Sequence, residues 1–284
     1  MSTNDTNKIN KYYQNTAWDY KHLWRTDALA IHFGYYDETI REHKKALLKM
    51  NEVMASFASI ESGEHVVDAG CGVGGSSIWL AENLGCYVTG INIVQEQLAE
   101  AVDFAKTHQV EKLVKFVNSD YTRLPLADKS QDVFWALESM VHAKDKNAII
   151  KEASRILKNN GKIVLAEYML REKPELNQKE QEYLNPWLSG WAMPSLYTTS
   201  QYEQVLSARG FTNIKILNVS KNITPSLQRL RLMCLFLLPG AMIMRFLRLF
   251  TKGRVANIKS SLRQIAAFRG GLWRYIIITA RKHD

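Results

Sequence analysis

Two ionisable side chains follow a long apolar run in the middle of this sequence. Residues 134–144 read FWALESMVHAK, so Glu138 ends a strand-like stretch and His142 comes four residues later. A carboxylate and an imidazole that leave the core together are suited to proton transfer or to stabilising a positive charge. What they act on depends on the elements that position them.

Size, charge and cysteine content narrow the class of protein. The 284 residues are 46% hydrophobic, which is enough for one large α/β domain with a smaller appended part. Three cysteines without CxxC or metal-ligand spacing predict reduced thiols and no metal site. The polar N-terminus lacks a signal-peptide pattern, which favours a cytoplasmic protein. The longest apolar run, residues 232–244, contains Pro-Gly, and we expect it to be too short to span a bilayer.

Strand-like and helix-like segments alternate from residue 65 onward. Apolar strand-like runs lie at residues 65–70, 87–92, 114–120, 132–139 and 162–169. Helix-like stretches lie between them, at residues 76–84, 94–108 and 146–157. This alternation predicts an α/β fold with a Rossmann-like, doubly wound, mostly parallel sheet. Two later apolar runs, residues 211–219 and 273–282, are candidates for the last strands.

We expect four segments along the chain. Residues 1–60 form an N-terminal helical segment rich in aromatic and charged side chains, and residues 61–221 form the core. Residues 222–270 form an apolar, basic helical insertion, and residues 271–284 supply the last strand of the core.

A glycine-rich turn follows the first strand-like run. In HVVDAGCGVGGSS, Asp68 precedes Gly70, Gly72 and Gly74, which allow positive φ and a close approach of the backbone to a ligand. The spacing differs from the dinucleotide pattern GxGxxG and from the phosphate-binding loop. A nucleotide bound at this turn would therefore be an unphosphorylated one. The alternative is a turn that carries glycines for steric reasons, capped by Asp68.

Three motifs in order resemble those of the class I S-adenosylmethionine-dependent methyltransferases. VVDAGCGVGGSS resembles their first motif, NSDYTRLPLADKSQDVF the region around the adenine, and RILKNNGKIVLAE the late R-x-LKPGG motif with Asn-Asn in place of Pro-Gly. The resemblance covers roughly residues 60–170. It implies that the core binds S-adenosyl-L-methionine, and the alternative is a degenerate fold used for binding only.

The resemblance also implies a set of cofactor contacts. Asn92 stands where the family usually carries an acid for the ribose hydroxyls, with Gln97 near it, and Asp120 stands where an acid meets the adenine amino group. The full expected set is Tyr12, Tyr20, Asp68, Gly70, Cys71, Gly72, Asn92, Gln97, Asp120, Tyr121 and Glu138.

The segment ALESMVHA narrows the resemblance to sterol C-methyltransferases and tocopherol- and terpenoid-type enzymes, which carry E-A-x-x-H-A here and begin with an aromatic segment. It implies that residues 1–60 act as a lid over the cofactor pocket. Candidate lid contacts are Tyr12, Tyr13, Tyr20, Trp24, His32 and Tyr35, with helix packing as the alternative for each. We take Glu138, His142, His32 and Tyr35 as the catalytic candidates.

Glu138 and His142 suit two kinds of acceptor. With an alkene, methylation leaves a carbocation that aromatic faces and a carboxylate stabilise before a base removes a proton. With a hydroxyl, His142 is the general base and Glu138 orients it. The structural alternative is that Glu138 contacts the cofactor or caps a helix. The missing Asn/Asp-Pro-Pro-Tyr/Phe motif argues against N-methylation of a base or amide.

The C-terminal third is basic and apolar. From Gln201 onward the chain has 15 Lys and Arg against two acids, whereas the first 200 residues carry a net charge of −4. We expect a small lipophilic acceptor (sterol, isoprenoid, quinone or related natural product) under a cap of residues 222–270 that touches an anionic membrane surface. The alternative is packing on the domain or on the second subunit of a homodimer.

Three rival functions stay open. They are a methyltransferase for a polar amine or hydroxyl metabolite, a nucleic-acid-directed protein, and a non-catalytic membrane-binding protein. We expect no nucleic-acid partner, because the basic residues alternate with Leu, Met and Phe rather than with exposed aromatic side chains along a groove.

Overall fold

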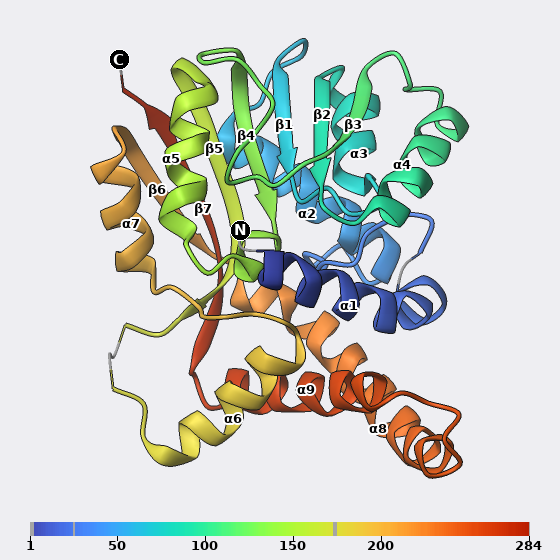
Figure 1. The fold of residues 1–284 in the computed structure, drawn as a ribbon. Helices are drawn as coiled ribbons and strands as arrows, with labels where there is room; N and C mark the ends of the chain where they lie inside the picture. The colour runs from blue at the N-terminus through green and yellow to red at the C-terminus, as the bar shows by residue number, and fades with distance from the viewer. Residues whose placement is uncertain (1–2, 25, 173–174, 284) are drawn as a thin grey trace.

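The computed structural model describes residues 3–24, 26–172 and 175–283 (Figure 1). In this part of the chain seven strands form one sheet in the order β3-β2-β1-β4-β5-β7-β6. Their bounds are β1 His65–Ala69, β2 Tyr87–Asn92, β3 Val114–Asn118, β4 Gln131–Leu137, β5 Leu157–Leu170, β6 Phe211–Asn218 and β7 Trp273–Lys282. Strands β1 to β5 pair in parallel, and β7 runs antiparallel to both β5 and β6. The predicted Rossmann-like, mostly parallel sheet is confirmed.

Helices cover both faces of the sheet, which explains the unbroken apolar runs in the sequence. Val66 and its neighbours pack with helices α2 (His43–Ala58) and α3 (Gly75–Leu84) on one face. Val67, one residue later, packs with α5 (Lys146–Ile156) and α7 (Thr199–Ala208) on the other. Helix α4 (Gln95–Thr107) connects β2 to β3. Strands buried on both faces need apolar residues at successive positions.

The start of β5 contains an irregularity where the sequence suggests a turn. Gln131 of β4 pairs with Leu157, but Val133 pairs with Lys162, so β5 carries extra residues between them. Asn160 has a φ of 61° in this segment. Asn tolerates the left-handed region better than most residues, so Asn-Asn can replace the usual Pro-Gly here.

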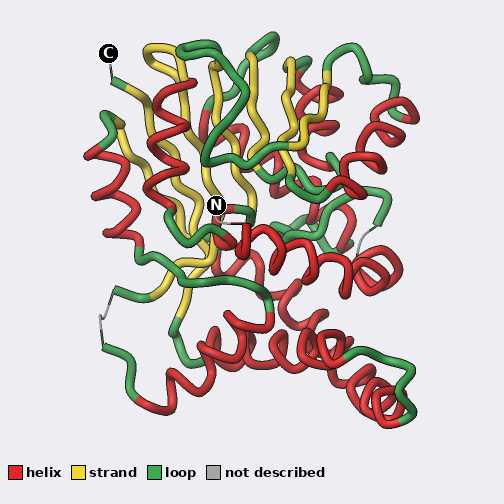
Figure 2. The backbone as a smooth tube through the Cα atoms, in the orientation of Figure 1, coloured by secondary structure: helices red, strands yellow, loops and turns green. Residues whose placement is uncertain are grey.

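A second layer of helices lies beyond the carboxyl ends of the parallel strands (Figure 2). It consists of α1 (Thr3–Asp19), a π-helical turn (Tyr20–Trp24), α6 (Gln178–Gly190), α8 (Ser220–Phe246) and α9 (Lys252–Arg269). Helix α9 packs against both α6 and α8. Segments from the two ends of the chain therefore meet above the same edge of the sheet. The division of the chain at residues 60, 221 and 270 stays a prediction.

Helix α8 is longer than the sequence suggested. It has 27 residues and continues through Pro239, so our argument that the apolar run is too short to cross a bilayer is wrong. By length and composition alone the helix could cross a membrane, and 17% of its most apolar window is buried. Its first half packs on the core, where Ile223 and Leu227 are buried.

Candidate active site

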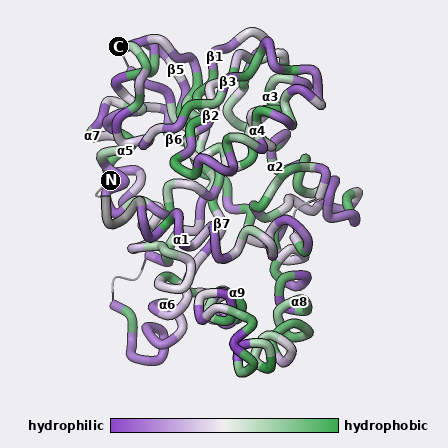
Figure 3. The backbone as a smooth tube through the Cα atoms, turned by 45° about the vertical axis from the view of Figure 1, so that its right-hand side comes forward, coloured by the Kyte–Doolittle hydropathy of each residue, from purple (hydrophilic) through white to green (hydrophobic). Residues whose placement is uncertain are grey.

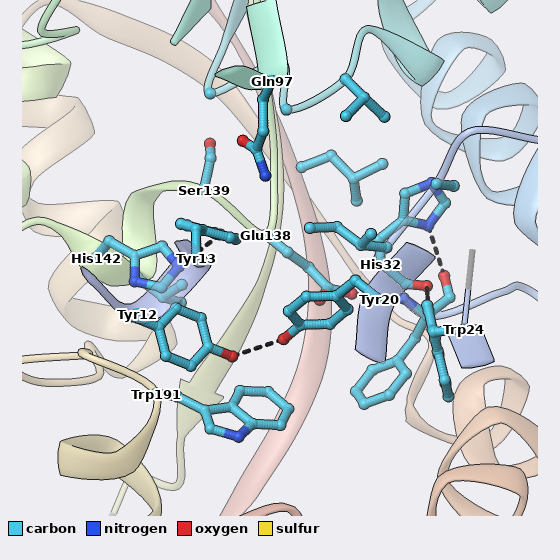
Figure 4. A pocket seen from close by; sticks show the side chains of 18 of the residues that line it. Tyr12, Tyr13, Tyr20, Trp24, His32, Gln97, Glu138, Ser139, His142 and Trp191 are labelled. Carbon is cyan, nitrogen blue, oxygen red and sulfur yellow. Dashed lines mark hydrogen bonds between the residues drawn. The ribbon is translucent and has the colours of Figure 1, made fainter. Parts of the chain in front are cut away.

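A deep cavity lies between the carboxyl ends of β1, β2 and β4 and the second layer of helices (Figure 4). This is the edge at which open α/β sheets bind ligands. One wall comes from the sheet and its loops, with Asp68, Gly70, Cys71, Gly72, Asn92, Gln97, Tyr121 and Glu138. The opposite wall comes from α1, α8 and α9, with Tyr12, Tyr13, Leu230, Met233, Leu237 and Ile258.

The glycine turn between β1 and α3 requires glycine for two different reasons. Gly70 has a φ of 90°, and a Cβ there would lie 2.4 Å from the Cβ of Ser139. Gly72 has a φ of 56°, but a Cβ there would meet nothing within 4 Å. The turn is therefore packed against β4 at Gly70 and open to the cavity at Gly72. This open cradle fits a ligand that needs close contact with the backbone.

Asp68 fixes this turn through a side-chain hydrogen bond. Its carboxylate accepts a hydrogen bond from the Ser77 hydroxyl at 2.6 Å, at the start of α3. Burial raises the pKa of Asp68 to about 6, and the Ser77 bonds oppose that shift. The carboxylate thus lines the cavity and also fixes the turn to the helix that follows it.

Asn92 at the end of β2 connects two parts of the same wall. Its amide Nδ2 donates to the Gly72 carbonyl at 3.2 Å and to Gln97 Oε1 at 2.8 Å. Its Oδ1 accepts from the Val94 backbone N–H at 3.3 Å. Asn92 and Gln97 therefore form one amide pair that lines the cavity, and Figure 4 shows the Gln97 amide directed toward it.

Of the two neighbouring residues expected near the adenine, the cavity includes only one. Tyr121 lines it and donates a hydrogen bond to the Ser139 carbonyl at 3.1 Å. Asp120 is not part of the lining. Its carboxylate accepts from the Thr122 backbone N–H and hydroxyl, both at 2.8 Å. The carboxylate closes an Asx turn next to Tyr121, and its expected contact with the adenine stays a prediction.

Glu138 occupies a strained position directly after β4. Its φ of 51° is uncommon for a residue with a Cβ. Its Oε1 accepts from the Phe33 backbone N–H at 2.8 Å and from the Tyr275 hydroxyl at 2.7 Å, and its Oε2 accepts from the Tyr168 hydroxyl. Burial raises the pKa of Glu138 to about 7, although these three hydrogen bonds oppose the shift. The carboxylate is thus poised between its two protonation states near neutral pH.

His142 is held by different partners from those expected. Its Nδ1–H donates to the Ala192 carbonyl at 3.4 Å, and its Nε2 accepts from the Tyr13 hydroxyl at 3.1 Å. Among the described residues the Ala192 carbonyl, rather than Glu138, holds Nδ1 of His142. Burial lowers the pKa of His142 to about 4, so the ring is neutral around pH 7. A neutral imidazole with Nε2 facing the cavity can accept a proton.

His32 and Tyr35 lie in the same loop but face different ways. His32 is buried and lines the cavity, its Nδ1–H donates to the Phe33 carbonyl at 2.9 Å, and its Nε2 has no partner among the described residues. Burial lowers the pKa of His32 to about 4. Tyr35 is not part of the lining. It packs on the core while its backbone N–H donates to the Ala46 carbonyl, and its catalytic role stays a prediction.

The sequence analysis missed a second buried carboxylate. Glu167 lies in β5, where its Oε1 accepts from the Met140 backbone N–H at 2.7 Å and its Oε2 has no partner among the described residues. Burial raises the pKa of Glu167 to about 8. The available signal was an acid inside the apolar run KIVLAEYM, because a charge inside a buried strand needs a specific reason.

The aromatic surroundings of Glu138 were also missed. Phe33, Tyr168 and Tyr275 pack edge to face, with ring centroids 5.6–6.2 Å apart, and Trp191 extends this group at 6.3 Å from Tyr168. Phe33, Tyr168 and Trp191 line the cavity. Tyr275 comes from the last strand of the chain, 137 residues after Glu138, so no local pattern reveals the contact.

The N-terminal helix closes the cavity from the side of α9. The Asp19 carboxylate at the end of α1 accepts from Arg254 Nε at 2.9 Å and 3.1 Å, and both side chains are largely buried. The hydroxyls of Tyr12 and Tyr20 hydrogen bond to each other at 2.6 Å. Tyr12, Tyr13, Tyr20 and Trp24, all expected lid contacts, line the cavity.

Residues 67–165 match a sequence profile described as a methyltransferase domain. The matched span contains the glycine turn, the Asn92–Gln97 pair and Glu138. These residues belong to the wall of the cavity that the sheet and its loops form. This chain is an S-adenosylmethionine-dependent methyltransferase. Its cofactor is S-adenosyl-L-methionine, and the class I resemblance read from the sequence is confirmed.

Two relatives of this methyltransferase align over most of its length. The 27-O-demethylrifamycin SV methyltransferase of Amycolatopsis mediterranei is 29% identical, and the alignment covers 80% of this chain and 81% of that protein. The chloroplastic tocopherol O-methyltransferase of Arabidopsis thaliana is 28% identical over 76% of this chain and 66% of that protein.

A solved structure shares the fold of this methyltransferase over its whole length. The geranyl diphosphate C-methyltransferase from Streptomyces coelicolor A3(2), in complex with Mg²⁺, geranyl-S-thiolodiphosphate and S-adenosyl-L-homocysteine, superposes with a TM-score of 0.73. The two sequences are 16% identical, and the superposition covers 99% of each chain. The likeness therefore extends to the second layer of helices that closes the cavity.

Proposed function

We propose that this enzyme methylates a carbon or oxygen atom of a small lipophilic acceptor, such as a sterol, isoprenoid, quinone or related natural product. The observation that carries the proposal is the wall opposite the glycine turn. Leu230, Met233, Leu237 and Ile258 give this wall an aliphatic surface, and the aromatic group around Glu138 continues it. An acceptor buried there gains most of its affinity from apolar contact. The names of the relatives, rifamycin and tocopherol methyltransferases, point to the same acceptor class.

The sheet wall is the proposed cofactor side of the cavity. Gly70 and Gly72 would hold the methionine part, and the Asn92–Gln97 amide pair would hold the ribose hydroxyls. Tyr12, Tyr20, Asp68, Cys71, Tyr121 and Glu138, which also line the cavity, and Asp120 next to Tyr121 complete the proposed cofactor set. Bound S-adenosylmethionine supplies an electrophilic methyl group on a positively charged sulfonium. The chain positions the acceptor in line with that group and excludes water from it.

For an alkene acceptor, Glu138 and the aromatic rings stabilise positive charge. Methylation of the double bond leaves a cation on the acceptor, and the faces of Phe33, Tyr168 and Trp191 are suited to contact it. The ionised Glu138 carboxylate, fixed by two tyrosines and the Phe33 N–H, adds negative charge without needing to move. Nε2 of His142 then takes the proton that restores the double bond.

For a hydroxyl acceptor, His142 is the proposed general base. Its Nδ1 is occupied by the Ala192 carbonyl, so Nε2 carries the lone pair. The hydroxyl of the acceptor would take the place of the Tyr13 hydroxyl at Nε2 and pass its proton to the ring during transfer. Glu138 then acts as a fixed negative charge near the sulfonium rather than as the partner of the histidine.

We propose a cytoplasmic location because the cysteine thiols are free. Cys71, Cys86 and Cys234 are all free and buried. Free cysteines without a disulfide partner are typical of a reducing compartment.

The test is transfer of a labelled methyl group to a panel of acceptors. Sterols, prenylated quinones and short isoprenoids are compared with glycine, sarcosine and small polar alcohols under the same conditions. The proposal expects the label in a product that is extracted into organic solvent. Substitutions in the aliphatic wall of the cavity should reduce the formation of this product. Label found only in the polar amines would overturn the proposal and favour the rival amine or hydroxyl metabolite.

A further inference from the structure

The outer surface of α8 is apolar where a surface helix is normally polar. Its exposed side chains, together with those of the turn that follows, form what we call the α8 tip. The α8 tip consists of Leu232, Leu235, Phe236, Met242, Ile243, Phe246, Leu247 and Leu249. Phe236 and Phe246 are 83% and 86% exposed. Figure 3 shows this end of α8 in the colour of hydrophobic residues. An exposed apolar patch of this kind marks a surface that binds something apolar.

Two opposite sides of α8 are apolar for different reasons. Leu230, Met233, Cys234 and Leu237, spaced three or four residues apart, line the cavity. Phe236, Ile243 and Phe246 repeat at similar spacing on the exposed side. A helix that is apolar all round is normally buried or in contact with lipid. This helix is largely exposed, so its outer side calls for an apolar environment.

The positive charge around the α8 tip favours an anionic partner. Residues 204–283 contain no Asp or Glu. Arg231, Arg248 and Lys252 are exposed, and none of them has an ion-pair partner within the described residues. The side chain of Arg254 stacks on the exposed Trp18 at 4.7 Å and on Phe250 at 4.0 Å, which adds an aromatic ring from α1 to the same region. Leu, Phe and Trp beside Arg and Lys are the composition of helices that lie in an anionic membrane interface.

We propose that the α8 tip docks the enzyme on an anionic lipid bilayer, with α8 lying in the interface. The helix is not placed across the membrane, because Ile223, Ser226 and Leu227 in its first half are buried against the core and its inner side lines the cavity. Leu237 lines the cavity and is also 37% exposed, so the docked surface adjoins the wall proposed for the acceptor. The added claim that a lipophilic acceptor enters from the bilayer along α8 rests on the proposed function.

The test is flotation of the full chain with lipid vesicles. Vesicles of phosphatidylcholine with about 30% phosphatidylglycerol are compared with phosphatidylcholine alone, at ionic strengths of about 0.05 and 0.5 M. The wild type is expected to float with the anionic vesicles at low salt and to lose at least about tenfold of that binding at high salt. Equal recovery with and without vesicles would overturn the proposal.

Two sets of variants separate the apolar and the charged contributions. The double variant Phe236→Ser, Phe246→Ser is expected to lower vesicle binding by about tenfold or more, since two large aromatic contacts with lipid are lost. Arg231→Glu with Arg248→Glu is expected to remove the preference for anionic lipid. Val102→Ser, which removes an exposed apolar side chain from α4, is the matched control and should bind vesicles like the wild type. Equal vesicle binding by the double variant and the wild type would overturn the proposal.

Two readouts keep this test separate from the proposed function. S-adenosylhomocysteine affinity and melting temperature should be the same in the variants and the wild type, because the α8 tip faces away from the cofactor side. The mass in solution is also measured without lipid. A wild-type dimer that the double variant converts to a monomer would overturn the membrane proposal and assign the α8 tip to the subunit interface of a homodimer.

Discussion

Glu138 is the residue on which the proposed chemistry depends most. It directly follows β4 in a strained conformation, and two tyrosine hydroxyls and one backbone N–H hold its carboxylate. Strain of this kind persists only where the surrounding structure holds the residue in place. The same contacts that fix the carboxylate keep it from acting as a freely moving base.

Glu138→Gln should lower kcat by about 100-fold or more while the affinity for S-adenosylhomocysteine changes by less than about threefold. The amide keeps the shape but removes the negative charge. Because burial raises the pKa of Glu138 to about 7, the fraction of ionised carboxylate grows as pH rises through 7. The wild-type kcat should therefore rise from pH 6 to 8, and that rise should be absent in the variant. S-adenosylhomocysteine lacks the sulfonium charge, so a large loss of its affinity would contradict the catalytic assignment and leave Glu138 as a cofactor ligand only.

Glu167→Gln should have a higher free energy of unfolding than the wild type, and the difference should grow as pH rises. Burial raises the pKa of Glu167 to about 8, whereas the unfolded carboxyl ionises near its ordinary value. Between those values the folded state binds more protons than the unfolded state, so wild-type stability falls as pH increases, by at most about 1.4 kcal/mol per pH unit. Gln keeps the acceptor for Met140 N–H without the charge. Unfolding by urea at pH 5, 6.5 and 8 measures the difference, and a difference that is independent of pH would contradict the shifted pKa.

A comparison of Gly70→Ala with Gly63→Ala separates the steric cost of a Cβ in the glycine turn from the cost of backbone strain. Both glycines have positive φ, so both substitutions add backbone strain of about 1 kcal/mol. The new Cβ at position 70 would also lie 2.4 Å from the Cβ of Ser139, whereas the Cβ at position 63 meets nothing within 4 Å. We expect Gly70→Ala to lower the free energy of unfolding by about 1–3 kcal/mol more than Gly63→Ala. Equal losses in urea unfolding would show that the turn moves away from β4.

At the scale of the elements, the cavity depends on the attachment of α1 to α9. The Asp19–Arg254 pair joins them across 235 residues of sequence. Removing one side chain of a partly buried, bidentate ion pair costs more stability than removing one from an exposed pair, because the remaining charge stays without its partner. The pair therefore holds the proposed lid closed over Tyr12, Tyr13 and Tyr20.

Arg254→Ala should loosen α1 while the sheet stays intact. Amide hydrogen exchange in residues 8–19 is expected to become about tenfold faster, with strand amides unchanged. The affinity for S-adenosylhomocysteine should fall by several-fold if α1 covers the cofactor. Lys158→Ala, which breaks an ion pair with Asp132 far from the cavity, is the control and should change neither quantity. Unchanged exchange in α1 in the Arg254 variant would contradict the role of the pair.

The elements of the core could be predicted from the sequence because their signals are local. Strands buried on both faces read as continuous apolar runs, and the glycine turn between β1 and α3 needs positive φ at fixed positions. The length and orientation of helix α8 had no such signal, although residues 222–270 were expected to be helical. Its inner side faces the cavity and its outer side is apolar as well, so no polar stripe marks its orientation, and Pro239 looked like a break although the helix continues.

At the scale of the whole molecule, the half of the site opposite the sheet comes from contacts between distant segments. Glu138 meets Phe33 and Tyr275, which lie 105 and 137 residues away in the sequence. His142 meets Tyr13 across 129 residues. The sequence could place Glu138 and His142 at the edge of the sheet, but it could not show that tyrosines surround one and that the Ala192 carbonyl orients the other. The sequence also could not show that Tyr35 packs on the core, because the direction of one side chain in a loop depends on tertiary packing.

Calorimetric titration of S-adenosylhomocysteine into the wild type and into Asn92→Leu is the most direct test of the arrangement of the cavity. Leu removes the amide that joins Gly72 to Gln97 but keeps a side chain of similar size. We predict micromolar binding by the wild type, a loss of about tenfold or more in Asn92→Leu, and no change in Leu230→Ala on the opposite wall. Equal affinity in all three proteins, or no binding by the wild type, would contradict the cofactor side proposed for the sheet wall.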